Sequence, residues 1–444
     1  MSGIVGSKLN HRGSGLVGSL GTDGQVLTSA GAGVSAVYED ASAGGGISWQ
    51  SVETGSTFTA VAGNGYPVNT TAQACTVTLP AGSVGDTIEF VDYAGTWDTN
   101  NVTLTADGSE KIKGSTVDVI IDGEREAVTI TYVDATQGWI ATSAANETAT
   151  VIKQPYTVGW LVVGGGGSGG YNRGPGGGAA GGYRYGTALS LSVGETYTIA
   201  VGGGGASSTT APNDGSDSSI SGSGITTITS TGGGAGGMDG VDSRNGQDGG
   251  SGGGAGCDSS NTGAVGSGNT PSISQYSAAG ETTTVQGYDG GTCTGGSPNE
   301  AGGGGGGASA VGTNSSANTA GAGGAGSANS IIGSSVTYAG GGGGGANGDS
   351  SNGVVGAGGA GGGGAGRGSA AGNGDAGSGT DYLGGGGGGH SGQYITGNPG
   401  AGGDGIVILR IPTASVGTAS GAEAAIIDGA YTVYKWHGNG SYVA

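Results

Sequence analysis

The sequence predicts an all-β protein: a small β-sandwich module followed by a glycine-rich sandwich of left-handed polyglycine II helices framed by β-strands. Two observations predict this fold class. Residues 49–147 alternate apolar and polar side chains in short runs separated by turn residues, which is the pattern of half-buried strands. From residue 148 onward glycine dominates, and it supplies 116 of the 444 residues. Its longest runs recur at intervals between short β-branched segments.

The first 48 residues are small and polar, and we interpret 1–48 as an N-terminal connector or attachment segment. The Asp23-Gly24 pair is a strong turn signal and predicts one hairpin in this segment.

Residues 49–147 contain strand-like runs such as "CTVTLP", "DTIEFVD" and "EAVTITYVD". We interpret Asp107-Gly108 and Asp122-Gly123 as hairpin turns between such strands. The large side chains expected to fill the core of this module are Trp49, Phe90, Trp97 and Trp139.

Residues 148–411 contain hexaglycine runs at Gly302–Gly307, Gly340–Gly345 and Gly384–Gly389, whose starts are 38 and 44 residues apart. A flexible linker has no need of such regular spacing, nor of strands such as "GWLVV" and "GIVILRIP" at its two ends. Polyglycine II has three residues per turn and directs its N–H and C=O groups outward. Rods without Cβ atoms can therefore pack side by side and bond to one another, so we predict an ordered lattice that displays exposed loops. Residues 412–444 are predicted to form a C-terminal β-hairpin.

Four features in succession resemble the glycine-rich domain of phage tail fibres and their tip adhesins, over residues 151–411. They are "GWLVVGGGGSGG", "LSLSVGETYTIAVGGGGA", the repeated hexaglycine and the closing "AGGDGIVILRIP". The segments "KLNHRGSGLVGSLGTDGQVLTSAGAG" and "YPVNTTAQACTVTLP" resemble N-terminal modules of tail-fibre-like virion proteins of cyanophages and other marine phages. The resemblance implies a polyglycine II sandwich whose distal loops touch host surface receptors.

The charge balance restricts the partners. The chain has 12 basic and 32 acidic residues, a formal net charge of −20, and no visible Lys/Arg cluster, so we expect no nucleic-acid binding. No apolar run approaches 18 residues, so we expect no membrane insertion. The N-terminus lacks the apolar stretch of a signal peptide, and we expect a protein made in the host cytoplasm that reaches the outside on a virion.

No pattern of a cofactor or metal site is visible, and we expect none. The three histidines are far apart in sequence, and the three cysteines fit no zinc pattern. Cys257 and Cys293 could pair across a loop, but three reduced thiols are the favoured interpretation. We expect no enzymatic activity.

The main functional hypothesis is therefore a phage fibre protein or adhesin that binds a host-cell receptor, a glycan or an outer-membrane protein, through loops on the glycine-rich scaffold. The alternative is a purely structural virion fibre of the capsid, neck or tail, and a minor alternative is a glycan depolymerase. Expected partners are the receptor and other virion proteins. A homotrimer is favoured by the resemblance, with a monomeric tip on another fibre as the rival.

Loop aromatics and cations are the candidates for receptor contact, because tyrosine rings stack on sugar faces and carry a polar tip. Each could instead pack over the edge of a rod. The candidate set is Tyr171, Arg173, Arg244, Tyr276, Tyr288, Tyr382, His390 and Tyr394.

Overall fold

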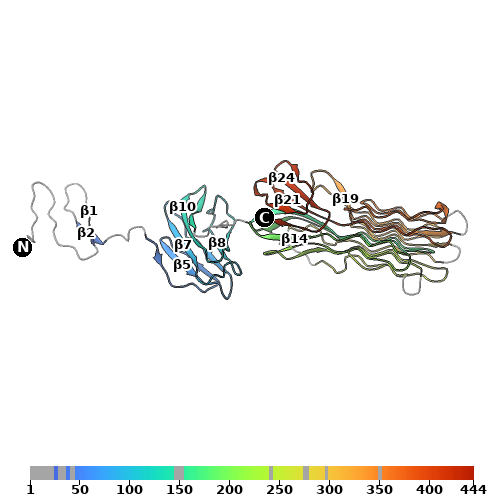
Figure 1. The fold of residues 1–444 in the computed structure, drawn as a ribbon, viewed down its shortest axis with the longest axis horizontal. Helices are drawn as coiled ribbons and strands as arrows, with labels where there is room; N and C mark the ends of the chain where they lie inside the picture. Colours follow the sequence, from blue (N-terminus) through green and yellow to red (C-terminus); the bar gives the residue numbers. More distant parts are fainter. Residues whose placement is uncertain are drawn as a thin grey trace, which may run out of the picture. The chain divides into compact units, whose positions relative to one another are not determined.

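The computed structural model describes residues 25–28, 37–40, 46–144, 155–239, 244–273, 280–295, 299–348 and 353–444 (Figure 1). They fall into two compact units, Met1–Gln154 and Pro155–Ala444. Within the described ranges the helical segments are the short 3-10 turns η2 (Ser369–Ala371) and η3 (Thr413–Ser415). No helix in these ranges is long and apolar enough to cross a membrane. The prediction of an all-β fold is confirmed.

The first unit begins with an antiparallel pair, β1 (Gln25–Thr28) and β2 (Val37–Asp40). The Asp23-Gly24 pair lies outside the described residues. The module that follows is a sandwich of two sheets with strand orders β11-β10-β7-β5-β3 and β4-β6-β8-β9. Its strands are β3 (Ser48–Trp49), β4 (Thr57–Thr59), β5 (Asn64–Val68), β6 (Cys75–Thr78), β7 (Thr87–Asp92), β8 (Val102–Thr105), β9 (Val119–Ile121), β10 (Ala127–Asp134) and β11 (Gly138–Ala144).

The core of this sandwich holds Phe90, Trp97 and Trp139, which are fully buried as predicted. The prediction for Trp49 is wrong, because its side chain is 52% exposed. Trp49 lies on β3, which among the described strands pairs with β5 alone, and it packs beside Gly65 of β5.

The hairpin interpretation of the two Asp-Gly pairs is also wrong. Strands β4 to β8 alternate between the two sheets, so the neighbours β5–β7, β4–β6 and β6–β8 are parallel. Asp122-Gly123 joins β9 of one sheet to β10 of the other, and Asp107-Gly108 lies in the long connection between β8 and β9. An alternating pattern shows that a strand has one buried face, but it does not show which sheet the strand joins.

The second unit contains a sandwich of two five-stranded sheets with orders β13-β12-β21-β24-β23 and β16-β15-β14-β25-β22. Trp160, Tyr197, Trp436 and Tyr442 meet in the core between them. The strands are β12 (Tyr156–Val163), β13 (Tyr183–Leu191), β14 (Thr196–Ala200), β15 (Ser218–Gly222), β16 (Ile228–Ser230), β21 (Ile406–Pro412), β22 (Thr418–Ser420), β23 (Ile426–Asp428), β24 (Tyr431–Trp436) and β25 (Gly440–Val443).

The C-terminal residues contain the predicted hairpin, because β23 and β24 pair antiparallel with Gly429 and Ala430 between them, but the hairpin is part of one sheet of the sandwich. Strand β24 pairs with β21, whereas β25 pairs with β14 in the opposite sheet. The end of the chain therefore contributes two strands to each sheet of the sandwich, β23 and β24 to one and β22 and β25 to the other. Two short pairs complete the unit: β17 (Asn299–Ala301) with β20 (Ala346–Gly348), and β18 (Ser327–Asn329) with β19 (Val336–Tyr338).

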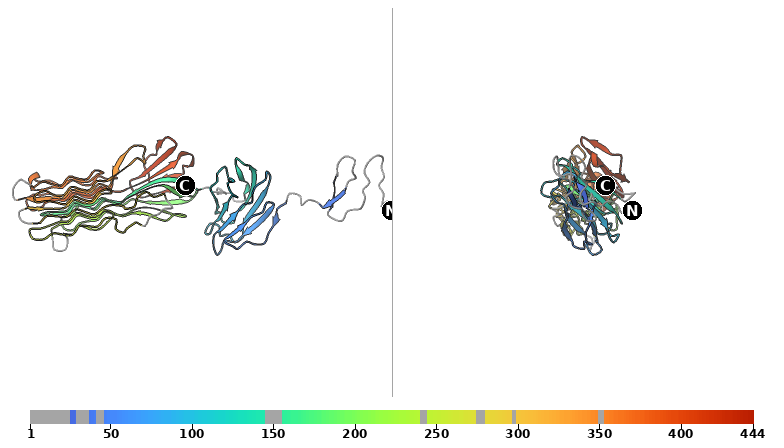
Figure 2. Two further views of the ribbon diagram at one scale, coloured as in Figure 1. Left: turned by 180° about the vertical axis from the view of Figure 1, so that it is seen from behind. Right: turned by 90° about the vertical axis from the view of Figure 1, so that its left-hand side faces the viewer.

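The glycine runs continue from these strands as long rods, which Figures 1 and 2 show extending side by side away from the sheets. Gly302–Gly307 illustrates the bonding. The N–H groups of Gly302 and Gly305, three residues apart, donate to Gly345 and Gly342 of one neighbouring rod. The other N–H groups of the run donate to Ala255 and Gly252 of a second rod, and to Thr313 and Ala310 of a third. The six carbonyls accept, in order, from Gly321, Gly177, Gly291, Gly324, Ala180 and Tyr288.

This pattern identifies polyglycine II. Every third residue faces the same neighbour, so the rod has three residues per turn. Each donor and acceptor of the run is used, by six neighbouring segments. Of the glycines in the three hexaglycine runs only Gly384 has a positive φ, so the rods have the sign of φ of the left-handed polyproline-type helix. A Cβ at Gly304 would overlap the carbonyl oxygen of Ala322, which explains why these runs contain only glycine.

Rods at the surface of the lattice lack a neighbour on one side, and Asp and Asn side chains supply the missing acceptors there. Asn245 accepts from the backbone N–H of Ala264 at 2.8 Å, and Asp248 accepts from that of Ser267 at 2.6 Å. Asn245 and Asp248 are three residues apart, so they lie on the same side of their rod.

Candidate functional site

The chain reverses at both ends of the lattice, and the two ends differ. Gly164, directly after β12, donates to Gly182, directly before β13, so this end adjoins the sheets. Gly170 donates to Gly176 at the other end of the same two rods. We call this second end, where residues 171–174 reverse the chain, the distal end.

Tyr171 and His390 meet at the distal end. Their rings are stacked at 5.6 Å between centroids with an angle of 11°, and the backbone N–H of His390 donates to Gly170. The imidazole is fully buried, and its Nε2 lies 2.9 Å from the carbonyl oxygen of Gly374. Because a carbonyl only accepts, Nε2 carries the proton, and Nδ1 has no partner among the described residues. Burial lowers the pKa of His390 and favours the neutral ring.

Arg173 organises a second cluster beside them. Asn172 and Arg173 both have positive φ, 71° and 49°, which makes the reversal tight. The Arg173 guanidinium lies 3.0 Å from Asp239 and 3.3 Å from Glu300. The Glu300 side chain is only 2% exposed, whereas the Arg173 side chain is 31% exposed. Asn347, paired with Glu300 across β17 and β20, also donates to this carboxylate.

Arg244 pairs with Asp258 in another part of the distal end. Its Nε and Nη2 atoms lie 3.0 and 2.7 Å from the same carboxylate oxygen. The other oxygen of Asp258 accepts from the backbone N–H groups of Ser260 and Asn261. These backbone hydrogen bonds, with the guanidinium, lower the pKa of Asp258 to about 2.

Tyr394 is the most exposed of the predicted tyrosines that the structure describes, at 55%. Its loop is anchored on both sides. Before Tyr394, the side-chain oxygen of Gln393 accepts from Asn347 at 2.6 Å; after it, Ile395 is buried and the backbone N–H of Thr396 donates to Asn373 at 3.0 Å. The ring is therefore presented to solvent by a fixed backbone.

The remaining predicted residues do not join this surface. Tyr288 donates its N–H to Gly307, at the end of the rods near the sheets. Tyr382 stacks on His437 at 3.7 Å, also beside the sandwich. Tyr276 lies outside the described residues. The structure thus brings Tyr171, Arg173 and His390 together and leaves Tyr288 and Tyr382 at the opposite end.

Sequence reasoning missed the buried carboxylates. Between Glu195 and Glu423 the sequence contains only two glutamates, Glu281 and Glu300, among many aspartates. Both are 2% exposed and paired with arginine, Glu281 with Arg184 and Glu300 with Arg173. The rarity of Glu in this region was a signal that could have identified these positions.

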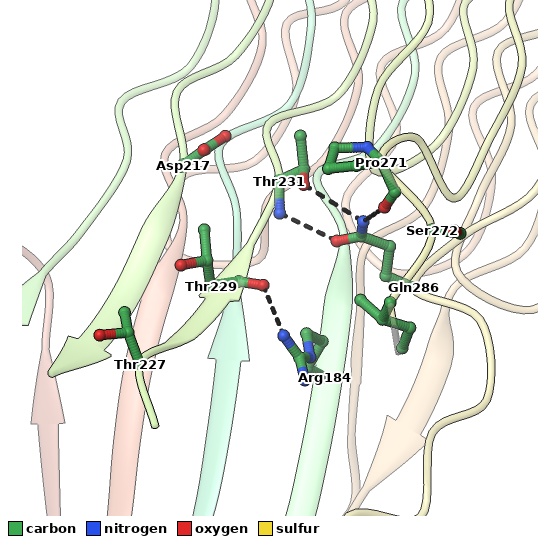
Figure 3. Close-up of a pocket in the computed structure, with 9 residues that line it drawn as sticks. Arg184, Asp217, Thr227, Thr229, Thr231, Pro271, Ser272 and Gln286 are labelled. Atoms are coloured by element: carbon green, nitrogen blue, oxygen red, sulfur yellow. Dashed lines mark hydrogen bonds between the residues drawn. The ribbon is translucent and has the colours of Figure 1, made fainter. Parts of the chain in front are cut away.

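A pocket of about 230 Å³ lies where the edges of the two sheets meet. Figure 3 shows Thr227 and Thr229 on one side and Pro271 and Gln286 on the other. Arg184 binds both oxygens of Glu281 at 2.8 and 2.7 Å and donates to the Thr229 carbonyl at 2.8 Å. Because the Arg184 guanidinium already binds Glu281 and Thr229, it is not available to bind an acidic ligand in the pocket.

The side chain of Gln286 extends the edge of β16. Its carbonyl accepts from the N–H of Thr231 at 2.9 Å, and its amide donates to Pro271. The backbone of Gln286 accepts from Tyr183 at the start of β13. This residue therefore links the end of β16 to the start of β13, the edge strands of the two sheets. Among all the described residues, no group of three or more His, Cys, Asp or Glu residues could hold a metal ion.

Comparison with known proteins finds a matching family model for each of the two units. A family model described as "Glycine-rich domain" matches residues 142–412. A second, "Bacteriophage T4 gp9/10-like protein, N-terminal", matches residues 5–152. The chain is 36% identical over 122 residues to the baseplate wedge protein gp10 of Enterobacteria phage T4. That alignment covers 26% of this chain and 17% of the relative, so the chain spans only a small part of that protein's length.

The larger match covers more than half of the chain and coincides with the polyglycine II lattice and its strands. The chain therefore belongs to the glycine-rich domain family, and its N-terminal unit relates it to the structural proteins of phage tails and baseplates.

Proposed function

We propose that this protein is a phage virion component whose second unit binds a host-cell surface receptor at the distal end of the lattice. Its first unit attaches it to other proteins of the tail or baseplate. The match of residues 5–152 to a phage N-terminal module supports the attachment. The receptor proposal depends on one observation: the distal reversals fix Tyr394 and Arg173, both accessible to solvent, on a fully bonded scaffold.

The chemistry of the distal end suits a glycan or an outer-membrane protein. A tyrosine ring packs on the apolar face of a sugar, and the guanidinium of a partly exposed arginine side chain donates to hydroxyl or carboxylate oxygens. Because the rods already order these loops, binding costs little additional conformational entropy. An ordered surface of this kind favours recognition over a purely mechanical role.

The purely structural fibre is the competing function. The six-neighbour bonding of the rods makes a stiff spacer whether or not the loops bind anything. The depolymerase needs two carboxylates flanking a glycosidic bond. At the distal end Asp239 and Glu300 are both engaged by Arg173, which is a structural arrangement. We therefore keep a non-enzymatic protein as the proposal.

Assembly is part of the proposal. We expect the protein on the virion surface as a homotrimer, with a monomeric tip as the alternative, and without contact to nucleic acid or insertion into a membrane. Light scattering of the purified full chain, which gives its molar mass directly, separates three copies from one.

Binding by the separate units tests the function. Each unit has its own core, so residues 1–154 and 155–444 can be produced separately. We expect labelled 155–444 to bind cells of the phage's host, and 1–154 to bind virion tails that lack the protein. If 155–444 binds no host cells while 1–154 still binds tails, the structural function is correct and the receptor proposal is wrong.

A further inference from the structure

Cys257 and Cys293 lie at the distal ends of two adjacent rods. The rods are joined just before them by the hydrogen bond from Ala255 N–H to Gly291, at 3.0 Å. The Cys257 thiol contacts the carbonyl oxygen of Thr294 at 3.1 Å, and the Cys293 thiol contacts that of Gly256 at 3.0 Å. Each thiol therefore lies against the backbone directly beside the other cysteine. Both cysteines are free in the structure.

We propose that Cys257 and Cys293 form a disulfide bond when the folded protein meets a low-molecular-weight disulfide such as oxidised glutathione. The lattice holds the two cysteines side by side, because hydrogen bonds order both rods as far as the cysteines. It also requires no metal or enzyme. The reaction is independent of whether the distal end binds a receptor.

The two thiols differ in exposure and in pKa, and these differences decide which of them reacts first. Cys257 is fully buried, whereas Cys293 is partly exposed. A hydrogen bond from the Cys257 thiol lowers the pKa of Cys293, while the same contact and burial raise the pKa of Cys257. Thiolates are the attacking species in disulfide exchange, so Cys293 reacts first.

The exchange proceeds in two steps. The Cys293 thiolate attacks one sulfur of oxidised glutathione, forms a mixed disulfide and releases one glutathione thiolate. The Cys257 sulfur then attacks the Cys293 sulfur and breaks its bond to glutathione, and the Cys257 proton passes to the departing glutathione sulfur. The protein loses two hydrogen atoms, and one glutathione disulfide is reduced to two thiols.

The bond would close a loop over residues 257–293 and reduce the freedom of the unfolded chain. It would also fix the strand-like contact in which Gly174, next to Arg173, donates to the Cys257 carbonyl. We expect the melting temperature of the second unit to rise by about 5–10 °C on oxidation.

Mass spectrometry of the full chain after incubation with oxidised glutathione tests the proposal. We expect an intact mass lower by two hydrogens, a single thiol that titrates after unfolding, and a reducible cross-link between peptides containing Cys257 and Cys293. Cys75→Ala is the matched control and should form the same cross-link with no thiol left to titrate, because Cys75 is buried in the first unit and its pKa is raised to about 11.

Two further variants test the order of the steps. Cys257→Ala should stop as a glutathione adduct on Cys293, and Cys293→Ala should remain unmodified. The proposal is overturned if the wild-type chain keeps three titratable thiols, or if it stops as a stable glutathione adduct without the cross-link.

Discussion

One carboxylate oxygen of Asp214 accepts a hydrogen bond from the backbone N–H of Ala235, at 2.8 Å, across two adjacent rods. Asp217, three residues further along, does the same for Gly232 at 2.9 Å. A carboxylate here occupies the place of the carbonyl that a further rod would provide. The same bonding by Asn245 and Asp248 indicates that much of the acidity of the glycine-rich region completes the lattice at its surface.

This role predicts different effects for two substitutions at Asp214. Asp214→Ala leaves the N–H of the fully buried Ala235 without its acceptor, which we expect to lower the free energy of unfolding by about 2 kcal/mol. Asp214→Asn keeps an acceptor oxygen and should cost less than half of that. Denaturant unfolding of the second unit measures both, and equal losses would contradict the role of the side chain as an acceptor.

Because the rods inside the lattice are packed against one another, replacing an interior glycine even by alanine should destabilise the protein. In Gly304→Ala, the new methyl group would overlap the carbonyl of Ala322, and we expect a loss of about 3 kcal/mol or more. Gly438→Ala is the control, since a Cβ there meets nothing within 4 Å. Thermal unfolding followed by circular dichroism compares the two, and a neutral Gly304→Ala would show that the rods are not packed as described.

The sequence predicts the glycine lattice but not the position of each aromatic side chain. The hexaglycine spacing predicts the lattice because no other ordered structure excludes Cβ atoms so strictly. It does not predict which loops share a surface. The rods run alternately in opposite directions, so Tyr288 and Tyr394 occur in similar loop sequences yet lie at opposite ends. Trp49 is a similar case, because its exposure follows from β3 being an edge strand.

The buried pair Arg184–Glu281 predicts a large effect when one partner is removed. Both side chains are at most 3% exposed, so Arg184→Met leaves an uncompensated buried carboxylate and should cost about 3–5 kcal/mol. The double variant Arg184→Met with Glu281→Leu should recover much of that loss. Lys435→Met, which breaks the more exposed pair with Glu423, should cost less than about 1 kcal/mol. Similar losses for the two single variants in urea unfolding would contradict this account.

The neutral His390 predicts a pH dependence at the distal end. Its pKa in the folded protein lies below the ordinary value of 6.5, so the unfolded chain binds the proton more readily. Stability should therefore fall as the pH decreases through 6.5 toward the lowered pKa. The variant His390→Gln should lose this part of the pH dependence, while His437 remains as a shared background in both proteins. Identical changes in melting temperature between about pH 7.5 and pH 5 in the two proteins would show that His390 is not the titrating group.

The most direct measurement compares host-cell binding by the full chain carrying Tyr394→Ala with that by Tyr288→Ala. Both tyrosines are exposed, but Tyr394 lies at the distal end and Tyr288 at the end beside the sheets. The account predicts that Tyr394→Ala weakens binding by about tenfold, the loss expected for one stacked aromatic contact, while Tyr288→Ala binds like the wild type. Unchanged binding by Tyr394→Ala together with a loss in Tyr288→Ala would contradict a distal receptor surface.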